Sequence, residues 1–290
     1  MKLSRFYEQV VKFGSQRDPR IKPRIKPYPD SAILYGAPDT EISKILVGID
    51  IETAELLLAD RLRQRQGLDL VVSHHPEGRA YAQLYRVMQL QVDLLQKLGL
   101  DRKVAQELLD ERMSEVERRI LPNNHTRPVD AARLLNLPFI CIHTPADNQV
   151  AWFVQKLLDR EGPKKIEEIV EILNTLPEYK EAVKVSAGPR IILGNPKSRV
   201  GKVSVEMTGG TEGSREVFDK MYKAGIRTLV CMHLSEEHFK KVKELNLNVI
   251  IAGHISSDTL GLNLLLDRIE KEAKQEFETI SCSGFTRVRR

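Results

Sequence analysis

Two segments of the chain place a histidine and an aspartate four residues apart, directly after an apolar stretch. The first pair is His143 and Asp147, and the second is His254 and Asp258. Each apolar stretch is typical of a buried strand, and a helical pattern follows each pair. Imidazoles and carboxylates gathered at strand ends can bind divalent metal ions. We therefore interpret the two pairs as parts of one metal site.

A third apolar stretch, residues 68–73, ends in a histidine pair, His74 and His75, which Pro76 follows. Neighbouring residues on a strand point to opposite faces, but beyond the strand end the backbone can bend and bring both rings to one side. The two histidines could then bind two different ions, or one could bind an ion while the other supports it.

Each of these residues also has an ordinary structural interpretation. A single histidine at a strand end is usually satisfied by its neighbours, and an aspartate before a helix usually caps that helix. The three occurrences together favour the metal site. Histidine and aspartate without thiolates suit zinc, manganese, iron or cobalt. Two such ions suit hydrolysis, because one lowers the pKa of a bound water and the other polarises the substrate oxygen.

Two matching series of strands and helices must position these residues. Residues 44–73 and 200–231 each predict a strand, a helix and a second, parallel strand reached by a right-handed crossover. His254 follows His143 by the same number of residues as Asp258 follows Asp147. The chain therefore has the pattern of a diverged duplication of one α/β unit, in which ligands gather at the carboxyl ends of the strands.

The segment between these strands and the first His/Asp pair, about residues 80–135, predicts a helical insertion. Its amphipathic helices could form a lid or an oligomer contact, but ordinary core packing is the favoured interpretation. A further helix is expected at 149–158, which leaves Asp147 in the loop before it. The predicted fold is α/β, with duplicated domains, mixed sheets and this insertion. The first half covers residues 1–150 and the second half residues 151–290.

The length and composition are those of a globular protein with room for two domains, with 290 residues of which 41% are hydrophobic. No apolar run reaches the roughly 18 to 20 residues that cross a bilayer. The first residues carry charges too early for a signal peptide. Cys141, Cys231 and Cys282 are too scattered for a disulfide framework. These features predict a cytoplasmic location and no membrane partner, with Cys141 and Cys231 as buried thiols.

The net charge is +5, and much of the excess lies near the two ends of the chain. Residues 1–31 predict a short helix followed by an extended arm rich in proline and arginine. A basic surface can attract nucleic acid or an anionic substrate. Because no nucleic-acid-binding motif accompanies the charge, a solvated surface is favoured over a nucleic-acid partner.

Residues 208–214, Thr-Gly-Gly-Thr-Glu-Gly-Ser, predict a glycine-rich turn before a helix that begins at Gly213. Its N–H groups could bind a phosphate, and a simple tight turn is an equal alternative. No Gly-x-Ser-x-Gly elbow supports a serine hydrolase. Among the other histidines, His125, His233 and His238 lack a convincing set of partners. His233 takes the position in the second half that His74 takes in the first.

The motifs together resemble the Nif-three-like family of dinuclear-metal proteins, often catalogued as type 2 GTP cyclohydrolase I. The resemblance covers about residue 30 to the end, and its specific parts are Ser-His-His-Pro at 73–76 and the late Gly-His-x-x-x-acid at 253–258. It implies two intertwined α/β domains and a ring-shaped homo-oligomer, commonly a hexamer. It also implies two divalent ions, with Asp258 bridging them and His143 lining the same cavity. The metal ligands that it implies are His74, His75, Asp147, His254 and Asp258.

The chain departs from the family pattern at four places. The family usually has glutamate at position 258, Thr-Asn-Leu-Asp at 144–147 and Cys-Gly-Gly-Ser-Gly at the glycine-rich turn, and its helical insertion is shorter. These departures affect the substrate more than the metal site. The sequence therefore predicts a metal-dependent hydrolase, similar to GTP cyclohydrolase type 2, that acts on a small anionic or nucleotide-like substrate. The alternative is a non-enzymatic regulatory protein with a structural metal site.

Overall fold

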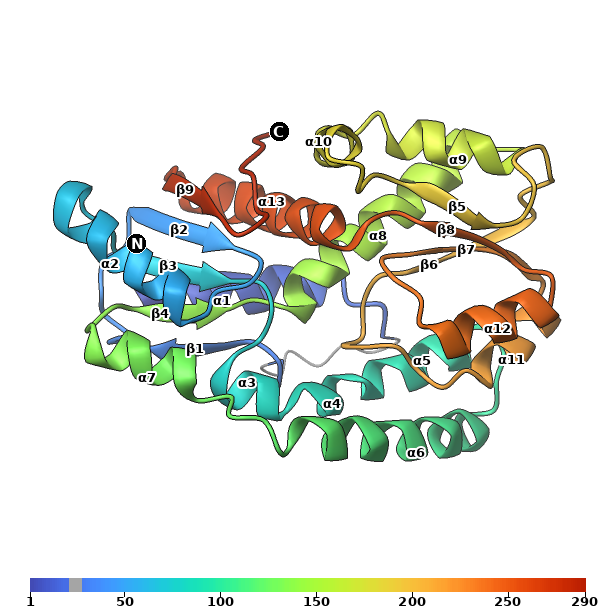
Figure 1. Cartoon of the computed structure of the whole chain (residues 1–290), viewed down its shortest axis with the longest axis horizontal. Helices are drawn as coiled ribbons and strands as arrows, with labels where there is room; N and C mark the ends of the chain where they lie inside the picture. Colours follow the sequence, from blue (N-terminus) through green and yellow to red (C-terminus); the bar gives the residue numbers. More distant parts are fainter. Residues whose placement is uncertain (21–27) are drawn as a thin grey trace.

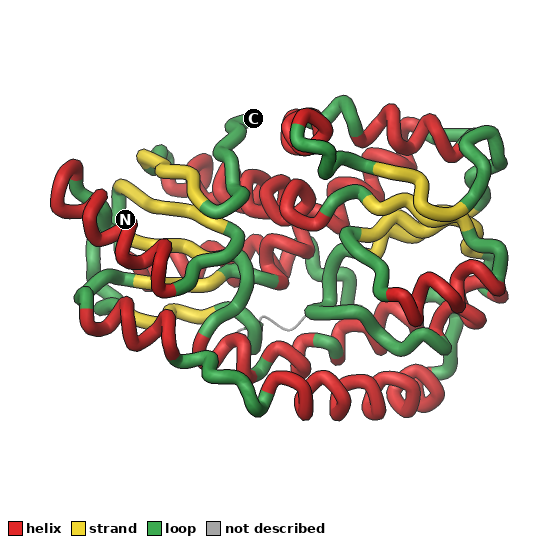
Figure 2. Tube along the Cα trace, viewed as in Figure 1, coloured by secondary structure: helices red, strands yellow, loops and turns green. Residues whose placement is uncertain are grey.

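Two separate β-sheets with helices on their faces make up the described part of the chain, residues 1–20 and 28–290 of a computed structural model. Figure 1 shows the two sheets side by side, with α8 (Thr144–Glu161) and α13 (His254–Ala273) crossing the space between them. The view coloured by secondary structure separates the two groups of strands clearly (Figure 2). The expected α/β fold with mixed sheets is confirmed.

The first sheet has five strands in the order β1-β4-β3-β2-β9. β1 is antiparallel to β4, and the other neighbours are parallel, including the predicted pair β2 and β3. Parallel strands buried on both faces are typically rich in Val, Ile and Leu, as β2 and β3 are. The strands are β1 (Ala32–Tyr35), β2 (Lys44–Gly48), β3 (Leu70–Ser73), β4 (Phe139–Cys141) and β9 (Glu278–Cys282).

The second sheet repeats four of these strands in the order β5-β8-β7-β6, again with its first pair antiparallel and the others parallel. The repetition agrees with the predicted duplication. Its strands are β5 (Arg190–Leu193), β6 (Lys202–Glu206), β7 (Ile226–Cys231) and β8 (Asn248–Ile251).

The strand registers correct one expected correspondence between the halves. Ser73 lies opposite Gly48 at the end of the first parallel pair, and Cys231 lies opposite Glu206 at the end of the second. Two residues beyond these equivalent ends come His75 and His233. His233 therefore corresponds to His75 and not to His74. The expected match was wrong because sequence similarity alone does not locate the ends of the strands.

The chain crosses between the two sheets more than once. After the second sheet is complete, β9 returns to the first sheet and pairs with β2. α8 and α13 each contribute to both cores: Ala146 and Leu262 pack in the core of the first sheet, whereas Val150 and Leu260 pack in the core of the second. The division of the chain near residue 150 stays a prediction.

The helical insertion packs inside the chain, as favoured. Met88, Val92 and Leu109 are buried in a cluster of their own, and Val217 of the second half packs against it. The insertion runs along the side of both sheets (Figure 1). Its helices are α3 (Gly78–Ala82), α4 (Leu84–Val87), α5 (Gln89–Lys97), α6 (Arg102–Ile120) and α7 (Arg127–Leu134).

The remaining helices pack around the sheets and the two central helices, and α10 contacts α13. The predicted N-terminal helix is α1, which packs against α8 and α13. The expected proline- and arginine-rich arm ends at residue 30, and its residues 21–27 lie outside the described residues. The sequence interpretation missed β1 and α10. These helices are α1 (Leu3–Gln16), α2 (Thr53–Gln66), α9 (Ile166–Leu173), α10 (Pro177–Lys184), α11 (Val217–Lys223) and α12 (Glu236–Glu244).

Two expectations from the composition can be compared directly with the structure. Within residues 1–20 and 28–290, no helix combines the length and the apolar character needed to cross a membrane. Cys141 and Cys231 are buried free thiols, as predicted, and Cys282 is a partly exposed free thiol.

Gly261 sets the close approach of the two central helices. A Cβ atom at this position would lie 2.6 Å from the carbonyl oxygen of Ala146, nearer than real Cβ atoms come to such an atom. Alanine normally favours a helix over glycine by about 1 kcal/mol. We nevertheless expect Gly261→Ala to lower the free energy of unfolding by about 1–3 kcal/mol, because overpacking between rigid backbones outweighs that preference. Chemical denaturation measures the change, and a more stable variant would contradict the rigid contact.

Candidate metal centre

The predicted ligands converge where the two sheets face each other. His74 and His75 follow the end of β3, His143 and Asp147 begin α8, and His254 and Asp258 begin α13. Both helices start earlier than expected, at Thr144 and His254, because each continues directly from its strand with little intervening loop. Asp147 therefore lies inside the first helical turn and not in a loop. Each aspartate lies one turn after its histidine, and residues four apart share a helix face.

His74 lies at the centre of the cluster. Its Nε2 atom is 3.3 Å from Oδ1 of Asp147 and 3.4 Å from Oδ1 of Asp258. The His74 side chain is 1% exposed. One imidazole thus faces a carboxylate from each of the two central helices.

Asp258 faces the other two histidines with its second oxygen. Its Oδ2 atom lies 3.4 Å from Nε2 of His75 and 3.5 Å from Nε2 of His254. The two oxygens of one carboxylate are therefore directed at different imidazoles. This is the arrangement needed for a carboxylate to contact two ions at once.

Two overlapping groups of side chains have the spacing of a metal site. The ligand atoms of His74, His143 and Asp147 lie within 4.8 Å of one another, and so do those of His74, His75 and Asp258. Five of the six residues that the sequence singled out belong to these groups. His254 belongs to neither group, although its Nε2 atom lies 3.5 Å from Oδ2 of Asp258. The structure places His143 close enough to bind an ion itself, whereas the sequence interpretation only had it lining the cavity.

Several polar atoms of the cluster lack a hydrogen-bond partner in the described part of the chain. These buried atoms are both ring nitrogens of His74, Oδ1 of Asp147 and both carboxylate oxygens of Asp258. Buried polar groups are almost always hydrogen-bonded, and each exception needs an explanation. Divalent ions would satisfy Nε2 of His74 together with these carboxylate oxygens, so the residues fit a metal centre. The donor set suits zinc, manganese, iron or cobalt.

The electrostatics of the metal-free cluster favour a proton on His74. Burial by itself lowers the pKa of His74, but Asp258 and Asp147 outweigh it and raise the pKa to about 10. Burial raises the pKa of Asp258, and the imidazoles of His74, His75 and His254 bring it well below its ordinary value. Histidine binds a metal only in its neutral form, so a metal ion and this proton exclude each other at His74.

Two aspartates that the sequence interpretation missed contact the Nδ1 atoms of His75 and His143. Asp50 Oδ1 lies 2.6 Å from Nδ1 of His75, and Asp30 Oδ2 lies 2.8 Å from Nδ1 of His143. Carboxylates in this position fix the ring orientation of metal-binding histidines. Asp50 could have been found, because it follows a strand parallel to the one that ends before His74. Asp30 has no such signal, since β1 was not expected.

Asp30 is fully buried and also accepts hydrogen bonds from the backbone N–H and the hydroxyl group of Thr144. We expect Asp30→Asn to weaken metal binding about 10- to 100-fold, as the loss of such supporting partners does elsewhere. Titration against a competing chelator measures the affinity. Asp39→Asn, at an exposed position, is the matched control. An unchanged affinity would show that His143 needs no support.

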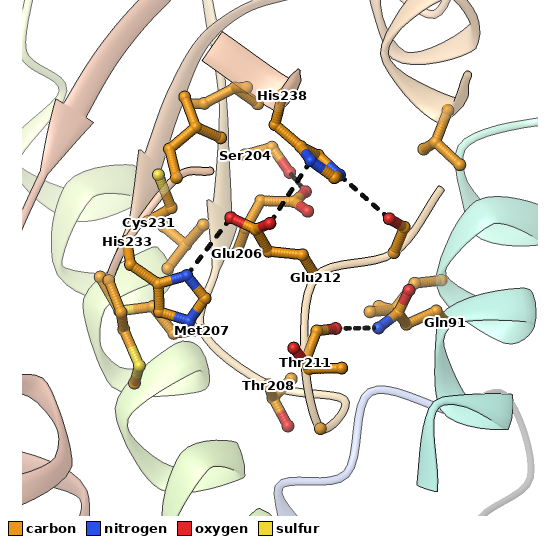
Figure 3. A pocket seen from close by; sticks show the side chains of 18 of the residues that line it. Gln91, Ser204, Glu206, Met207, Thr208, Thr211, Glu212, Cys231, His233 and His238 are labelled. Carbon is orange, nitrogen blue, oxygen red and sulfur yellow. Dashed lines mark hydrogen bonds and ion pairs between the residues drawn. The ribbon is translucent and has the colours of Figure 1, made fainter. Parts of the chain in front are cut away.

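A cavity of about 350 Å³ extends from the cluster toward the end of the second sheet. His143, Asp147, His254 and Asp258 form part of its wall. Other walls come from α5, α11 and the glycine-rich turn. Figure 3 shows part of the cavity wall, with polar side chains gathered around Glu212. The metal centre is therefore open to a chamber of the size of a small-molecule site.

The glycine-rich turn is held as a wall of this cavity. Gln91 of α5 donates hydrogen bonds to the carbonyl oxygens of Gly209 and Thr211. Figure 3 shows the bond to Thr211. α11 begins at Val217 and not at Gly213, so the turn is separated from the start of the helix. Glu212 points to His233 and His238, at 3.3 and 3.4 Å. These two histidines, which lacked partners in the sequence interpretation, thus share one carboxylate.

Comparisons with known proteins agree with this architecture. The sequence pattern of the Duf34/NIF3 (NGG1p interacting factor 3) family matches residues 112–285, more than half of the chain. The NIF3 superfamily protein from Sphaerobacter thermophilus is 25% identical, with a TM-score of 0.75, and the match covers 94% of this chain and 97% of that one. No curated protein has a significantly similar sequence.

Two more distant structures share the fold alone. Reduced HcgD from Methanocaldococcus jannaschii is 16% identical, with a TM-score of 0.59 and coverage of 97% of both chains. TTHA1606 from Thermus thermophilus is 14% identical, with a TM-score of 0.51 and coverage of 97% of both chains. The likeness covers nearly the whole chain, including both sheets.

Proposed function

The chain belongs to the Duf34/NIF3 family, and on this premise we propose that it is a metal-dependent hydrolase with two divalent ions in its His/Asp cluster. The observation that carries the proposal is Asp258, whose two buried oxygens face different imidazoles and lack hydrogen-bond partners among the described residues. The proposed metal ligands are His74, His75, Asp147, His254 and Asp258. His143 lies within reach of the same site.

Bound ions would supply an activated water and a polarised substrate oxygen. The protein's own residues would do the rest. Asp50 and Asp30 hold the rings of His75 and His143 in fixed orientations. The two central helices hold Asp147 and Asp258 on either side of His74. A preorganised set of this kind needs no rearrangement when substrate enters.

The opening of the cluster supports an enzyme over a purely structural metal site. Structural sites are usually closed by four protein ligands, whereas catalytic sites keep a position open. Here His254 is 41% exposed, and four of the cluster's residues line the cavity. The proposed substrate is small and carries an anionic, nucleotide-type oxygen group that would lie against the metal centre.

Turnover by the metal-loaded protein tests this function. A panel of phosphoesters and purine nucleotides, including GTP, is incubated with the metal-loaded protein and with His74→Ala. We expect hydrolysis of at least one class, lost in the variant because His74 faces both aspartates. Asp159→Asn, an exposed carboxylate change on α8, should keep full activity. Absence of turnover, or turnover equal in His74→Ala, would overturn the proposal.

We also propose that the protein forms a homo-oligomer, with a hexamer as the expected size, and that it acts in the cytoplasm. Leu57 and Leu58 on α2 are 52% and 47% exposed, and Leu134 on the neighbouring α7 is 77% exposed. Exposed apolar side chains on adjoining helices support an interface there. Light scattering measures the mass, and a monomer at micromolar concentration would contradict the oligomer.

A further inference from the structure

The first turn of α13 carries two of the proposed metal ligands, His254 and Asp258, and α10 packs against this helix (Figure 1). Tyr179 of α10 has the largest side chain among the fully buried ones of the described chain. Neither Tyr179 nor Ser257, the residue before Asp258, lines the cavity. Any role of Tyr179 at the metal centre must therefore act through α13.

Two successive hydrogen bonds connect Tyr179 to the start of α13. The Ser257 hydroxyl donates to the carbonyl oxygen of Gly253 at 2.6 Å, and the Tyr179 hydroxyl lies 2.9 Å from the same Ser257 oxygen. A serine hydroxyl has one proton, and a carbonyl oxygen can only accept. Tyr179 is therefore the donor to Ser257. Burial raises the pKa of Tyr179, so its hydroxyl group keeps the proton that it donates.

The backbone just before His254 contacts the same segment of the chain. Gly253 has a φ of +103°, and a Cβ atom there would lie 2.7 Å from the carbonyl oxygen of Ala187, just after the end of α10. The turn that leads into α13 thus meets this segment twice, at the Tyr179 hydroxyl and at the Ala187 backbone.

The residue beside Tyr179 fixes α10 to the middle of α13. The Glu178 side chain is fully buried, and its Oε1 atom accepts a hydrogen bond from Asn263 of α13 at 2.9 Å. Its Oε2 atom pairs with Arg290 at 2.5 Å. Separating the partners of a buried ion pair is strongly unfavourable, so α10 is held firmly against α13. The Tyr179 hydroxyl therefore reaches Ser257 from a rigid support.

We propose that Tyr179 is a positioning residue of the metal centre, which holds the first turn of α13 in place through Ser257. The two ligands in that turn, His254 and Asp258, then need no rearrangement when an ion enters. Asp30 holds the start of α8 in a similar way, on the other side of the site. The part of this inference that concerns the ion rests on the proposed function.

Zinc affinity tests the positioning role. The whole chain is titrated with Zn²⁺ against a competing chelator. We expect Tyr179→Phe, which removes only the hydroxyl group, to bind Zn²⁺ about ten times more weakly, as the loss of supporting partners does elsewhere. The matched control is Thr228→Val on β7, because the buried Thr228 hydroxyl also donates a hydrogen bond, to the carbonyl oxygen of Val200. The control should keep the affinity of the unaltered protein. Equal affinities of the two variants would overturn the inference.

A double-mutant cycle tests whether the effect passes through Ser257. Ser257→Ala removes the group that accepts the Tyr179 bond, so it should weaken Zn²⁺ binding at least as much as Tyr179→Phe. Tyr179→Phe added to Ser257→Ala should then change the affinity less than about twofold, because the effects of directly interacting residues are not additive. Two effects that multiply would show that Tyr179 acts by another route, and the inference would fail.

The visible absorption spectrum of bound Co²⁺ reports the arrangement of the ligands, independently of affinity. At full occupancy, we expect this spectrum to change in Tyr179→Phe and to stay the same in Thr228→Val. A spectrum of Tyr179→Phe identical to that of the unaltered protein would contradict the positioning role.

Hydrogen exchange separates this inference from the proposed function. With chelator present, the backbone amides of Ser257 and Asp258 should exchange about ten times faster in Tyr179→Phe than in Thr228→Val, because the turn opens more easily. If exchange and Zn²⁺ affinity both depend on Tyr179 but no hydrolysis is found, the positioning role stands and the hydrolase proposal fails. If hydrolysis is found but neither quantity depends on Tyr179, the positioning role fails and the hydrolase stands.

Discussion

Asp258→Asn is expected to remove most of the metal from the protein. Asparagine keeps the shape of the side chain, but it replaces a charged oxygen with an NH₂ group that cannot bind a cation. Because His74, His75 and His254 all face this one carboxylate, the change affects both proposed ions at once. We expect the metal content to fall from about two ions per chain to below one, and the affinity of any remaining ion to fall by at least about 100-fold. Elemental analysis and chelator competition measure the two quantities.

The control for this change is Asp159→Asn, which alters an exposed aspartate on α8 and should leave the metal content unchanged. Asp258→Glu is informative as well, because glutamate keeps the charge and lengthens the side chain by one methylene. We expect it to retain metal. If Asp258→Asn binds as much metal as the unaltered protein, the carboxylate is not a ligand and the bridging role fails.

Local sequence patterns were sufficient for the repeated core of the fold. Apolar stretches of the length of a strand located both βαβ units, and the parallel pairing of β2 with β3 followed from the crossover rule. β1 was missed because three of its four residues are only partly buried, so no continuous buried pattern marks it. α10 was missed because Pro177, which opens it, was not recognised as a first-turn proline.

The six site residues were identifiable because each sits next to a strong strand signal. Their supporting partners were not, because support depends on contacts between distant segments. Asp30 and His143 are 113 residues apart in the sequence. They come together because β1, which the sequence did not reveal, pairs with β4. The cavity was equally hidden, because the residues of α5, the glycine-rich turn and α11 that line it come from distant parts of the chain.

Metal binding is expected to stabilise the folded protein by about 4 kcal/mol when the free ion is present at about 1,000 times its dissociation constant. The proposed ligands lie directly after β3 and in the first turns of α8 and α13, which come from widely separated parts of the chain. Unfolding disperses them, so the ion binds the native state almost alone. Chemical denaturation with excess metal and with excess chelator measures the difference.

The metal-free protein should still fold, because a proton on His74 partly neutralises Asp147 and Asp258. A bound ion would take the place of that proton, and Asp147 of α8 and Asp258 of α13 would help to hold it. The stabilisation should therefore be absent in Asp258→Asn and reduced in Gly261→Ala, in which α8 and α13 are forced apart beside the site. Asp159→Asn should keep it in full. A protein whose free energy of unfolding is the same with metal and with chelator would show that the cluster does not bind ions in the folded state, and the hydrolase proposal would lose its chemical basis.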